Sequence, residues 1–400
     1  MKTNRRTFLQ GAGAVAGAGV LGFPNIVRAQ QSEYVVGASV PLTGPFALAG
    51  NLTLPALTDF QDQVNDAGGI GGISVRAVAE DSGNIPQNAL ANYRRAITDE
   101  NLVFYYGDST GFMKLVAPEL NETKRVLVGS TSFASELANP ATNPFQFVSG
   151  PTYQDQFDVL LQFIKSEGGG RLALIFADSE FGRDPIEHGK ARAAELGIEV
   201  VLEEVTKISG ADIETHVTRL AQTRPDFAIL HGYVTSVWPQ IIGGARQVGL
   251  PTQFLGTFWG MEKVIADRVT AQAGPFLDGY MGVMPYRYFY EAADAPAYQR
   301  LAALKKAQDP DFPNYLTTWY LQVTMTLELW KKSMETVIEQ DQEVNAETLA
   351  AALGSISGWD TGGFFGAPVT VTGHKIPQGR VYRYSADSGL FVPISDWIQV

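Results

Sequence analysis

The sequence predicts an α/β protein of two lobes, each built around a parallel sheet. Strands and helices alternate along the chain, and the alternation starts again after Gly150-Pro151. Such alternation is typical of Rossmann-like parallel sheets that carry helices on both faces. The roughly 370 residues that follow the N-terminal segment exceed what one core usually organises. Two lobes in tandem are therefore expected.

The first unit opens with an apolar strand and a turn rich in Gly and Pro at 41–45. Apolar residues at helical spacing follow, and the glycines of 65–69 end that helix, because glycine adopts left-handed closing geometry without strain. Pro86 suits the first turn of the next helix. The expected strands are 34–40, 73–79, 102–106 and 125–128, and the expected helices are 54–64, 86–99 and 113–122.

The second unit repeats this pattern, and the chain after Tyr280 then becomes rich in helix. A Gly-rich region from Trp359 onward is predicted to form strands. The expected helices are 154–166, 185–196, 212–222, 237–248, 296–307 and 315–336, and the expected strands are 171–176, 198–204, 227–231 and 253–255.

The first 29 residues are predicted to be an export signal. Basic residues precede an apolar, glycine-rich stretch at 11–22, and Val27-Arg28-Ala29 is a small-x-small cleavage pattern. The order Asn-Arg-Arg-Thr-Phe-Leu-Gln at 4–10 resembles a twin-arginine motif, whose route carries proteins already folded in the cytoplasm. The stretch falls short of the roughly 20 apolar residues that span a membrane, so we expect cleavage near Ala29 and a periplasmic protein.

The composition excludes several kinds of chemistry. The chain has no Cys, so it has no disulfide, no thiolate and no lipid-modified cysteine. Its net charge of −12 becomes −16 once the four basic residues of the signal are removed, and such a surface repels nucleic acid. The four histidines, at 188, 216, 231 and 374, are not spaced as a zinc site requires. We expect no metal, no cofactor and no nucleic-acid partner.

Ligands of open parallel sheets bind outside the carboxyl ends of the strands, where helix N-termini point their free N–H groups into the crevice. The loops at that edge are rich in hydroxyl groups, which suit a carboxylate there, and in aromatic rings. Each hydroxyl residue, taken alone, is also explained as a helix cap or a turn residue. Each aromatic residue, taken alone, is also explained as part of the hydrophobic core. The predicted ligand-binding residues are Phe46, Ser109, Thr110, Thr131, Ser132, Phe133, Phe181, Tyr233, Phe258 and Trp259.

Several motifs agree in order and spacing with one known family. They are Gly-Ala-Ser-Val-Pro-Leu-Thr-Gly-Pro-Phe at 37–46, Val-Asn-Asp-Ala-Gly-Gly-Ile-Gly-Gly at 64–72 with Asp81, Gly-Pro-Thr at 150–152, Asp-Ser-Glu-Phe-Gly at 178–182 and Gln-Val-Gly-Leu at 247–250. On these motifs the chain resembles the leucine/isoleucine/valine-binding family of periplasmic receptors, and the resemblance runs to the C-terminus.

The resemblance implies a type I periplasmic binding protein fold with a three-segment hinge near Gly150, 280–285 and Gly379. The N-terminal lobe would then comprise 30–150 plus 285–378, and the C-terminal lobe 151–284 plus 379–400. In such receptors the lobes close on the ligand, because contacts made by both lobes exist only in the closed state.

The resemblance also assigns roles in the site. It implies that Thr110, Thr131, Ser132 and Phe133 bind the ligand's carboxylate and that Phe181 and Tyr233 stand where the family has tyrosines. The family's acid, which neutralises an α-ammonium, falls at Phe258, where this chain has no carboxylate. A buried ammonium without a counter-charge is costly. We therefore expect a small apolar or aromatic carboxylate that lacks an α-amino group, unless Glu262 reaches back to restore the acid.

The implied function is that of a monomeric, non-enzymatic receptor that delivers a small molecule to the membrane permease subunits of an ABC importer. An amino-acid or amide receptor of the same fold, or a sensor that feeds a membrane signalling partner, remains an alternative. A second class is an exported serine esterase, since Gly-Asp-Ser-Thr-Gly at 107–111 matches the nucleophile-elbow pattern around Ser109, with His231 or His374 as the base.

Overall fold

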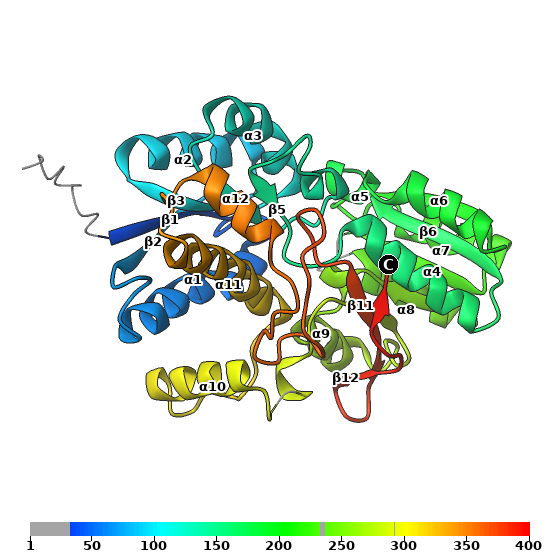
Figure 1. Cartoon of the computed structure of the whole chain (residues 1–400). Coiled ribbons are helices and arrows are strands. Elements are labelled where there is room, and N and C mark those ends of the chain that lie inside the picture. Colours follow the sequence, from blue (N-terminus) through cyan, green and yellow to red (C-terminus); the bar gives the residue numbers. More distant parts are fainter. Residues whose placement is uncertain (1–32, 233–236, 292) are drawn as a thin grey trace, which may run out of the picture. The chain divides into compact units, whose positions relative to one another are not determined.

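The computed structural model describes residues 33–232, 237–291 and 293–400. Within them the chain forms two α/β lobes, each around a sheet of its own (Figure 1). The predicted export signal and Tyr233 lie outside the described residues. None of the helices in the described part of the chain is long and apolar enough to cross a membrane.

The first lobe contains a sheet in which every strand pair is parallel, in the order β2-β1-β3-β4-β5. Its three central strands are apolar almost throughout, as expected for a sheet covered on both faces. The strands are β1 (Glu33–Val40), β2 (Ser74–Asp81), β3 (Leu102–Gly107), β4 (Leu127–Ser130) and β5 (Gln146–Phe147), and the helices among them are α1 (Ala47–Asp66), α2 (Pro86–Asp99) and α3 (Thr110–Thr123).

The second lobe contains a sheet with the order β12-β11-β10-β9-β8-β6-β7. Strands β6 to β10 pair in parallel, whereas β11 and β12 join antiparallel at one edge. The strands are β6 (Arg171–Ala177), β7 (Glu199–Thr206), β8 (Phe227–His231), β9 (Gln253–Gly256), β10 (Met281–Met284), β11 (Gln378–Ser385) and β12 (Leu390–Pro393), and the helices are α4 (Tyr153–Ser166), α5 (Glu180–Arg183), α6 (Ile186–Glu195), α7 (Ile213–Thr223), α8 (Val237–Gln247) and α9 (Lys263–Ala273).

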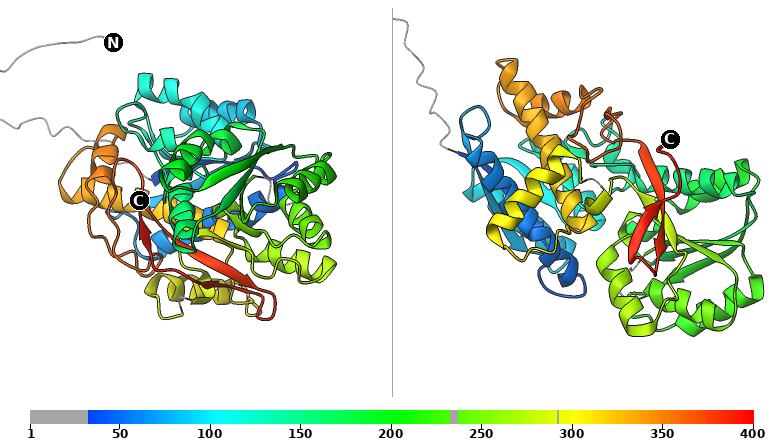
Figure 2. Two further views of the ribbon diagram at one scale, coloured as in Figure 1. Left: turned by 90° about the vertical axis from the view of Figure 1, so that its right-hand side faces the viewer. Right: turned by 90° about the horizontal axis from the view of Figure 1, so that it is seen from below.

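The chain passes three times between the lobes. It leaves the first sheet after β5, and after β10 it returns through α10 (Pro296–Gln308) to α11 (Thr318–Glu339) and α12 (Ala346–Gly354). Helix α11 packs against α1 and β4, and α12 also packs against β4. The last crossing brings β11 beside β10. The right-hand view of Figure 2 shows the orange helices with the blue lobe and the red strands with the green lobe.

The structure differs from the prediction at a few elements. Helix α1 begins at Ala47 rather than at 54, and it continues through Pro55. The region from Trp359 onward contains two isolated bridges, Trp359 to Val369 and Thr372 to Lys375, and regular strands begin only at Gln378. Strand β5 has two residues, too few for any periodicity to reveal. Helices α9 and α12 were also missed.

Candidate ligand-binding site

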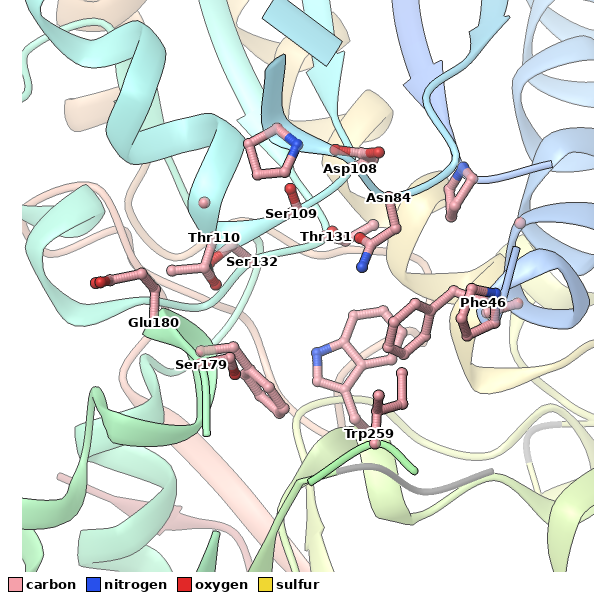
Figure 3. Close-up of a pocket in the computed structure, with 18 of the residues that line it drawn as sticks. Phe46, Asn84, Asp108, Ser109, Thr110, Thr131, Ser132, Ser179, Glu180 and Trp259 are labelled. Carbon is pink, nitrogen blue, oxygen red and sulfur yellow. Dashed lines mark hydrogen bonds between the residues drawn. The ribbon is translucent and has the colours of Figure 1, made fainter. Parts of the chain in front are cut away.

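A cavity of about 510 Å³ lies between the two lobes, at the carboxyl ends of both sheets. This volume lies within the usual range for small-molecule sites, roughly 300–1,000 Å³. The first lobe lines it with the loop after β1, the turn after β2, the start of α3 and the loop after β4. The second lobe contributes Tyr153, the α5 turn and Trp259 (Figure 3), and Trp319 comes from the start of α11.

Seven of the ten predicted residues line this cavity, namely Phe46, Ser109, Thr110, Thr131, Ser132, Phe181 and Trp259. Phe133 and Phe258 do not. Both side chains are fully buried and contact each other edge to face, with ring centroids 5.3 Å apart. They form the packing behind the cavity wall, which is the role that the core alternative assigned to aromatic residues. Tyr233 cannot be assigned because it lies outside the described residues.

The hydroxyl groups of the first lobe meet at the N-terminus of α3. Ser109 caps this helix, because its Oγ accepts a hydrogen bond of 3.2 Å from the N–H of Phe112. The Oγ1 of Thr110 lies 2.7 Å from the Oγ of Ser132. The first N–H groups of a helix lack partners within the helix and favour negative charge. This end of the cavity is therefore suited to an anionic oxygen.

Aromatic rings of the second lobe form the opposite wall. The Nε1–H of Trp259 donates to the hydroxyl of Tyr153 at 3.2 Å, and the ring of Phe181 lies 5.1 Å from that of Tyr153. Trp319 completes the wall, with its ring centroid 6.1 Å from Trp259. Such rings present apolar faces to a ligand, and aromatic pairs prefer the tilted geometries seen here.

His231, at the end of β8, supports this wall from behind. Its Nε2 lies 3.0 Å from the carbonyl oxygen of Phe181, and its Nδ1 lies 2.8 Å from the Oγ1 of Thr257. A carbonyl oxygen can only accept, so Nε2 carries the proton and Nδ1 accepts from the Thr257 hydroxyl. Burial lowers the pKa of His231 to about 3. The imidazole is therefore neutral and fixes the Phe181 turn.

Two carboxyl groups also lie in the cavity wall. Asp108 is buried; one of its oxygens accepts from the Ser82 hydroxyl, and the other has no partner among the described residues. Burial raises the pKa of this carboxyl. Glu180 pairs with Lys114 at 2.8 Å, and this hydrogen bond lowers its pKa. The described lining contains no Lys or Arg.

Glu262 is buried outside the lining of the cavity. Its carboxylate accepts from the N–H and the hydroxyl of Thr318, each at 2.7 Å, from the Tyr315 hydroxyl at 2.8 Å and from the N–H of Val264 at 3.0 Å. It thereby joins the N-terminus of α9 to that of α11. These four donors occupy the carboxylate that was considered as a substitute for the missing acid.

The surroundings of Ser109 do not support the esterase alternative. Ser109 Oγ accepts from a helix N–H, and neither candidate histidine is bonded to it. His231 is engaged with Phe181 and Thr257, while the Nδ1–H of His374 donates to the carbonyl of Gln146 at 2.7 Å. Within the described part of the chain, Ser109 is therefore not hydrogen-bonded to a histidine that could act as its base.

Four further residues line the cavity that were not predicted from the sequence, namely Asn84, Asp108, Tyr153 and Trp319. Trp319 was assigned to a predicted helix, where an aromatic residue is usually part of the apolar face, and Tyr153 directly precedes another predicted helix. Both stand in the first turn of their helices: Tyr153 directly follows the capping residue Thr152, and Trp319 is the second residue after the cap Thr317. An aromatic residue at the start of a helix at the lobe junction was the sequence signal that could have indicated a cavity-lining role.

Comparisons with known proteins show which family the chain is related to. The periplasmic binding protein family model matches residues 33–389, and the twin-arginine translocation signal model matches residues 2–22. The Leu/Ile/Val-binding protein of Escherichia coli strain K12 is 25% identical over 368 residues, which cover 89% of this chain and 94% of that protein. A Pseudomonas aeruginosa protein described as binding leucine, isoleucine, valine, threonine and alanine is 23% identical over 337 residues, covering 84% and 87%.

Solved structures share the fold. A branched-chain amino acid ABC transporter protein from Thermus thermophilus with bound valine superposes with a TM-score of 0.82 at 20% identity, covering 92% of this chain and 97% of that one. A fatty acid ABC transporter substrate-binding protein from Thermomonospora curvata gives a TM-score of 0.77 at 20% identity, covering 92% and 93%. The family model spans nearly all of the described residues, and a matching export signal precedes them. The chain therefore belongs to the periplasmic binding protein family and is exported to the periplasm.

Proposed function

We propose that this protein is the ligand receptor of an ABC importer and that its ligand is a small apolar or aromatic carboxylate without an α-amino group. The importer role is supported by the names of two structural neighbours, which describe them as ABC transporter proteins. The hydroxyl groups of Thr110 and Ser132 beside the α3 N-terminus would bind the carboxylate, and the rings of Phe181, Trp259 and Trp319 would cover the apolar part.

One observation carries the choice of ligand. At the position where the resemblance expects the acid that neutralises an ammonium, this chain has Phe258, and Phe258 is buried behind the wall. The nearest substitute in sequence, Glu262, is saturated by four donors that lie outside the cavity lining. An ammonium bound beside Phe258 would receive no counter-charge from either of these residues, and a buried ammonium without one costs several kcal/mol.

An amino-acid receptor is the second candidate, and Asp108 favours it. This carboxyl belongs to the first lobe, lies in the cavity wall and keeps one oxygen without a partner among the described residues. An ionised Asp108 could pair with a ligand ammonium from the opposite side of the site. The two candidates differ in a single functional group of the ligand.

The test compares acids with and without that group on one carbon skeleton. The mature protein would be melted with 3-phenylpropanoate or phenylalanine, and with 4-methylpentanoate or leucine. A ligand at about 100 times its dissociation constant adds roughly 2.7 kcal/mol of stability. We expect a raised midpoint with the deaminated acids and none with the amino acids. The opposite pattern would establish the second candidate, and no shift with any of the four would contradict both.

A further inference from the structure

The side chain of Asn84 lines the cavity, but the proposed function assigns it no ligand contact. It lies between β2 and α2, and its carboxamide points into the cavity, toward Trp259 (Figure 3). The carboxamide has no hydrogen-bond partner among the described residues. Most other polar groups of the lining are engaged: the hydroxyls of Thr53, Ser109 and Ser179 bind backbone groups, and Thr110 and Ser132 bind each other.

The backbone at this turn restricts which residues fit. Gly83 and Asn84 both adopt left-handed conformations, with φ of 59° and 58°. Ser82 holds the turn, because its Oγ accepts from the N–H of Asn84 at 3.0 Å and its carbonyl accepts from the N–H of Ile85 at 3.1 Å. Glycine takes this geometry freely, and Asn is one of the few other residues that tolerate it. The backbone thus explains Gly or Asn, but not a carboxamide directed into a cavity.

The surroundings of Asn84 determine what it can bind. A carboxamide both donates and accepts, and it carries no charge. Ser82 also donates to Asp108, so an acidic group stands behind the same turn, and the described lining has no Lys or Arg to balance a second ligand carboxylate. A hydroxyl fits both atoms of the carboxamide, since it can donate to Oδ1 and accept from Nδ2.

We propose that Asn84 binds a hydroxyl group of the ligand, so that the receptor selects hydroxylated apolar carboxylates over the unsubstituted acids. This inference rests on the proposed function, which supplies the carboxylate end at Thr110 and Ser132. Asn84 enters the cavity between those hydroxyls and the rings of Phe46 and Trp259 (Figure 3). A site built to bond a ligand hydroxyl rejects the analogue without it, because its own polar group is then left unpaired.

The test measures dissociation constants by calorimetry for 3-phenylpropanoate, 3-phenyllactate and 3-(4-hydroxyphenyl)propanoate. We expect the wild-type protein to bind at least one hydroxylated acid tenfold or more tightly than the parent acid. Asn84→Gly keeps a residue that favours the left-handed turn and removes only the carboxamide. It should reduce this preference to less than threefold, with the parent acid bound more tightly than by the wild-type protein, because no carboxamide is then left unpaired. Asn84→Asp is a second, nearly isosteric variant, and its negative charge should weaken the binding of all three acids.

The outcomes separate this inference from the function on which it rests. Equal binding of parent and hydroxylated acids to the wild-type protein would overturn the role of Asn84 and leave the carboxylate receptor intact. A preference that survives in Asn84→Gly would do the same, since Asn84 would then serve the backbone alone. If none of the three acids binds, the proposed function fails, and the inference falls with it.

Discussion

The ammonium of Lys114 and the carboxylate of Glu180 lie 2.8 Å apart, and this ion pair joins α3 of the first lobe to α5 of the second. Beside it, the N–H and hydroxyl of Ser135 donate to the carboxylate of Asp184, at 3.1 and 2.8 Å. These bonds cross from lobe to lobe at one flank of the cavity. They can form only while the two lobes are close together, so they favour the state that encloses a ligand.

Removing the ion pair should shorten the lifetime of the bound state. Exposed pairs contribute roughly 0.2–1 kcal/mol, so Lys114→Gln should speed ligand release by about 1.4- to fivefold in stopped-flow measurements. The matched control is Lys124→Gln, which breaks the exposed pair with Glu347, 2.7 Å long and confined to the first lobe. Equal acceleration in both variants, or none in Lys114→Gln, would contradict a role in closure.

Glu262→Gln should destabilise the fold. The carboxylate accepts four hydrogen bonds, and an amide would set its NH₂ against the donors of Thr318. Leaving buried donors unpaired costs about 1–3 kcal/mol, which urea unfolding would detect as a lower midpoint. Glu347→Gln, at an exposed position in the first turn of α12, is the control and should stay within about 0.5 kcal/mol of the wild-type protein. A midpoint for Glu262→Gln no lower than that of the control would show that the network adds little.

His231 should make the protein sensitive to acid. Its pKa is about 3 in the folded protein because of burial, whereas an unfolded histidine titrates near 6.5. The unfolded state therefore binds more protons, and stability is lost as the pH falls from about 6.5 towards 3. His231→Gln can still donate to Phe181 and should flatten this slope in thermal melts between pH 7 and 4.5. A variant that loses stability as steeply as the wild-type protein would assign the acid sensitivity to other groups.

Asp108 should contribute in the opposite direction. Burial raises its pKa, so the folded state holds the proton more tightly, and the stability gained from protonation is lost as the pH rises from about 4 through the raised value. Asp108→Asn mimics the protonated form. We expect it to melt above the wild-type protein at pH 8 and to match it near pH 4. A variant less stable at pH 8 would indicate that the ionised carboxylate has a partner in the folded protein.

The lobes and most elements could be predicted because apolar periodicity and helix-ending glycines are local signals. The sequence did not reveal which aromatic ring faces the ligand. Phe258 and Trp259 are neighbours in one 3₁₀ turn, and a single residue of offset sends Phe258 into the core and Trp259 to the cavity. The role of Asn84 in the cavity was not predicted for a similar reason, because a Gly-Asn pair between two elements indicates only a turn. Its direction depends on a left-handed backbone that is visible only in three dimensions.

The interleaved order of the two lobes has a consequence for synthesis. Strand β10 pairs with β11, which begins only at Gln378, and β4 is packed by α11 and α12, which follow the whole parallel part of the second sheet. Neither lobe can be completed until almost the entire chain has left the ribosome. Since the twin-arginine route carries folded proteins, the cavity, including Trp319 of α11, would be assembled before export. Receptor retained in the cytoplasm of an export-deficient strain should accordingly bind ligand already.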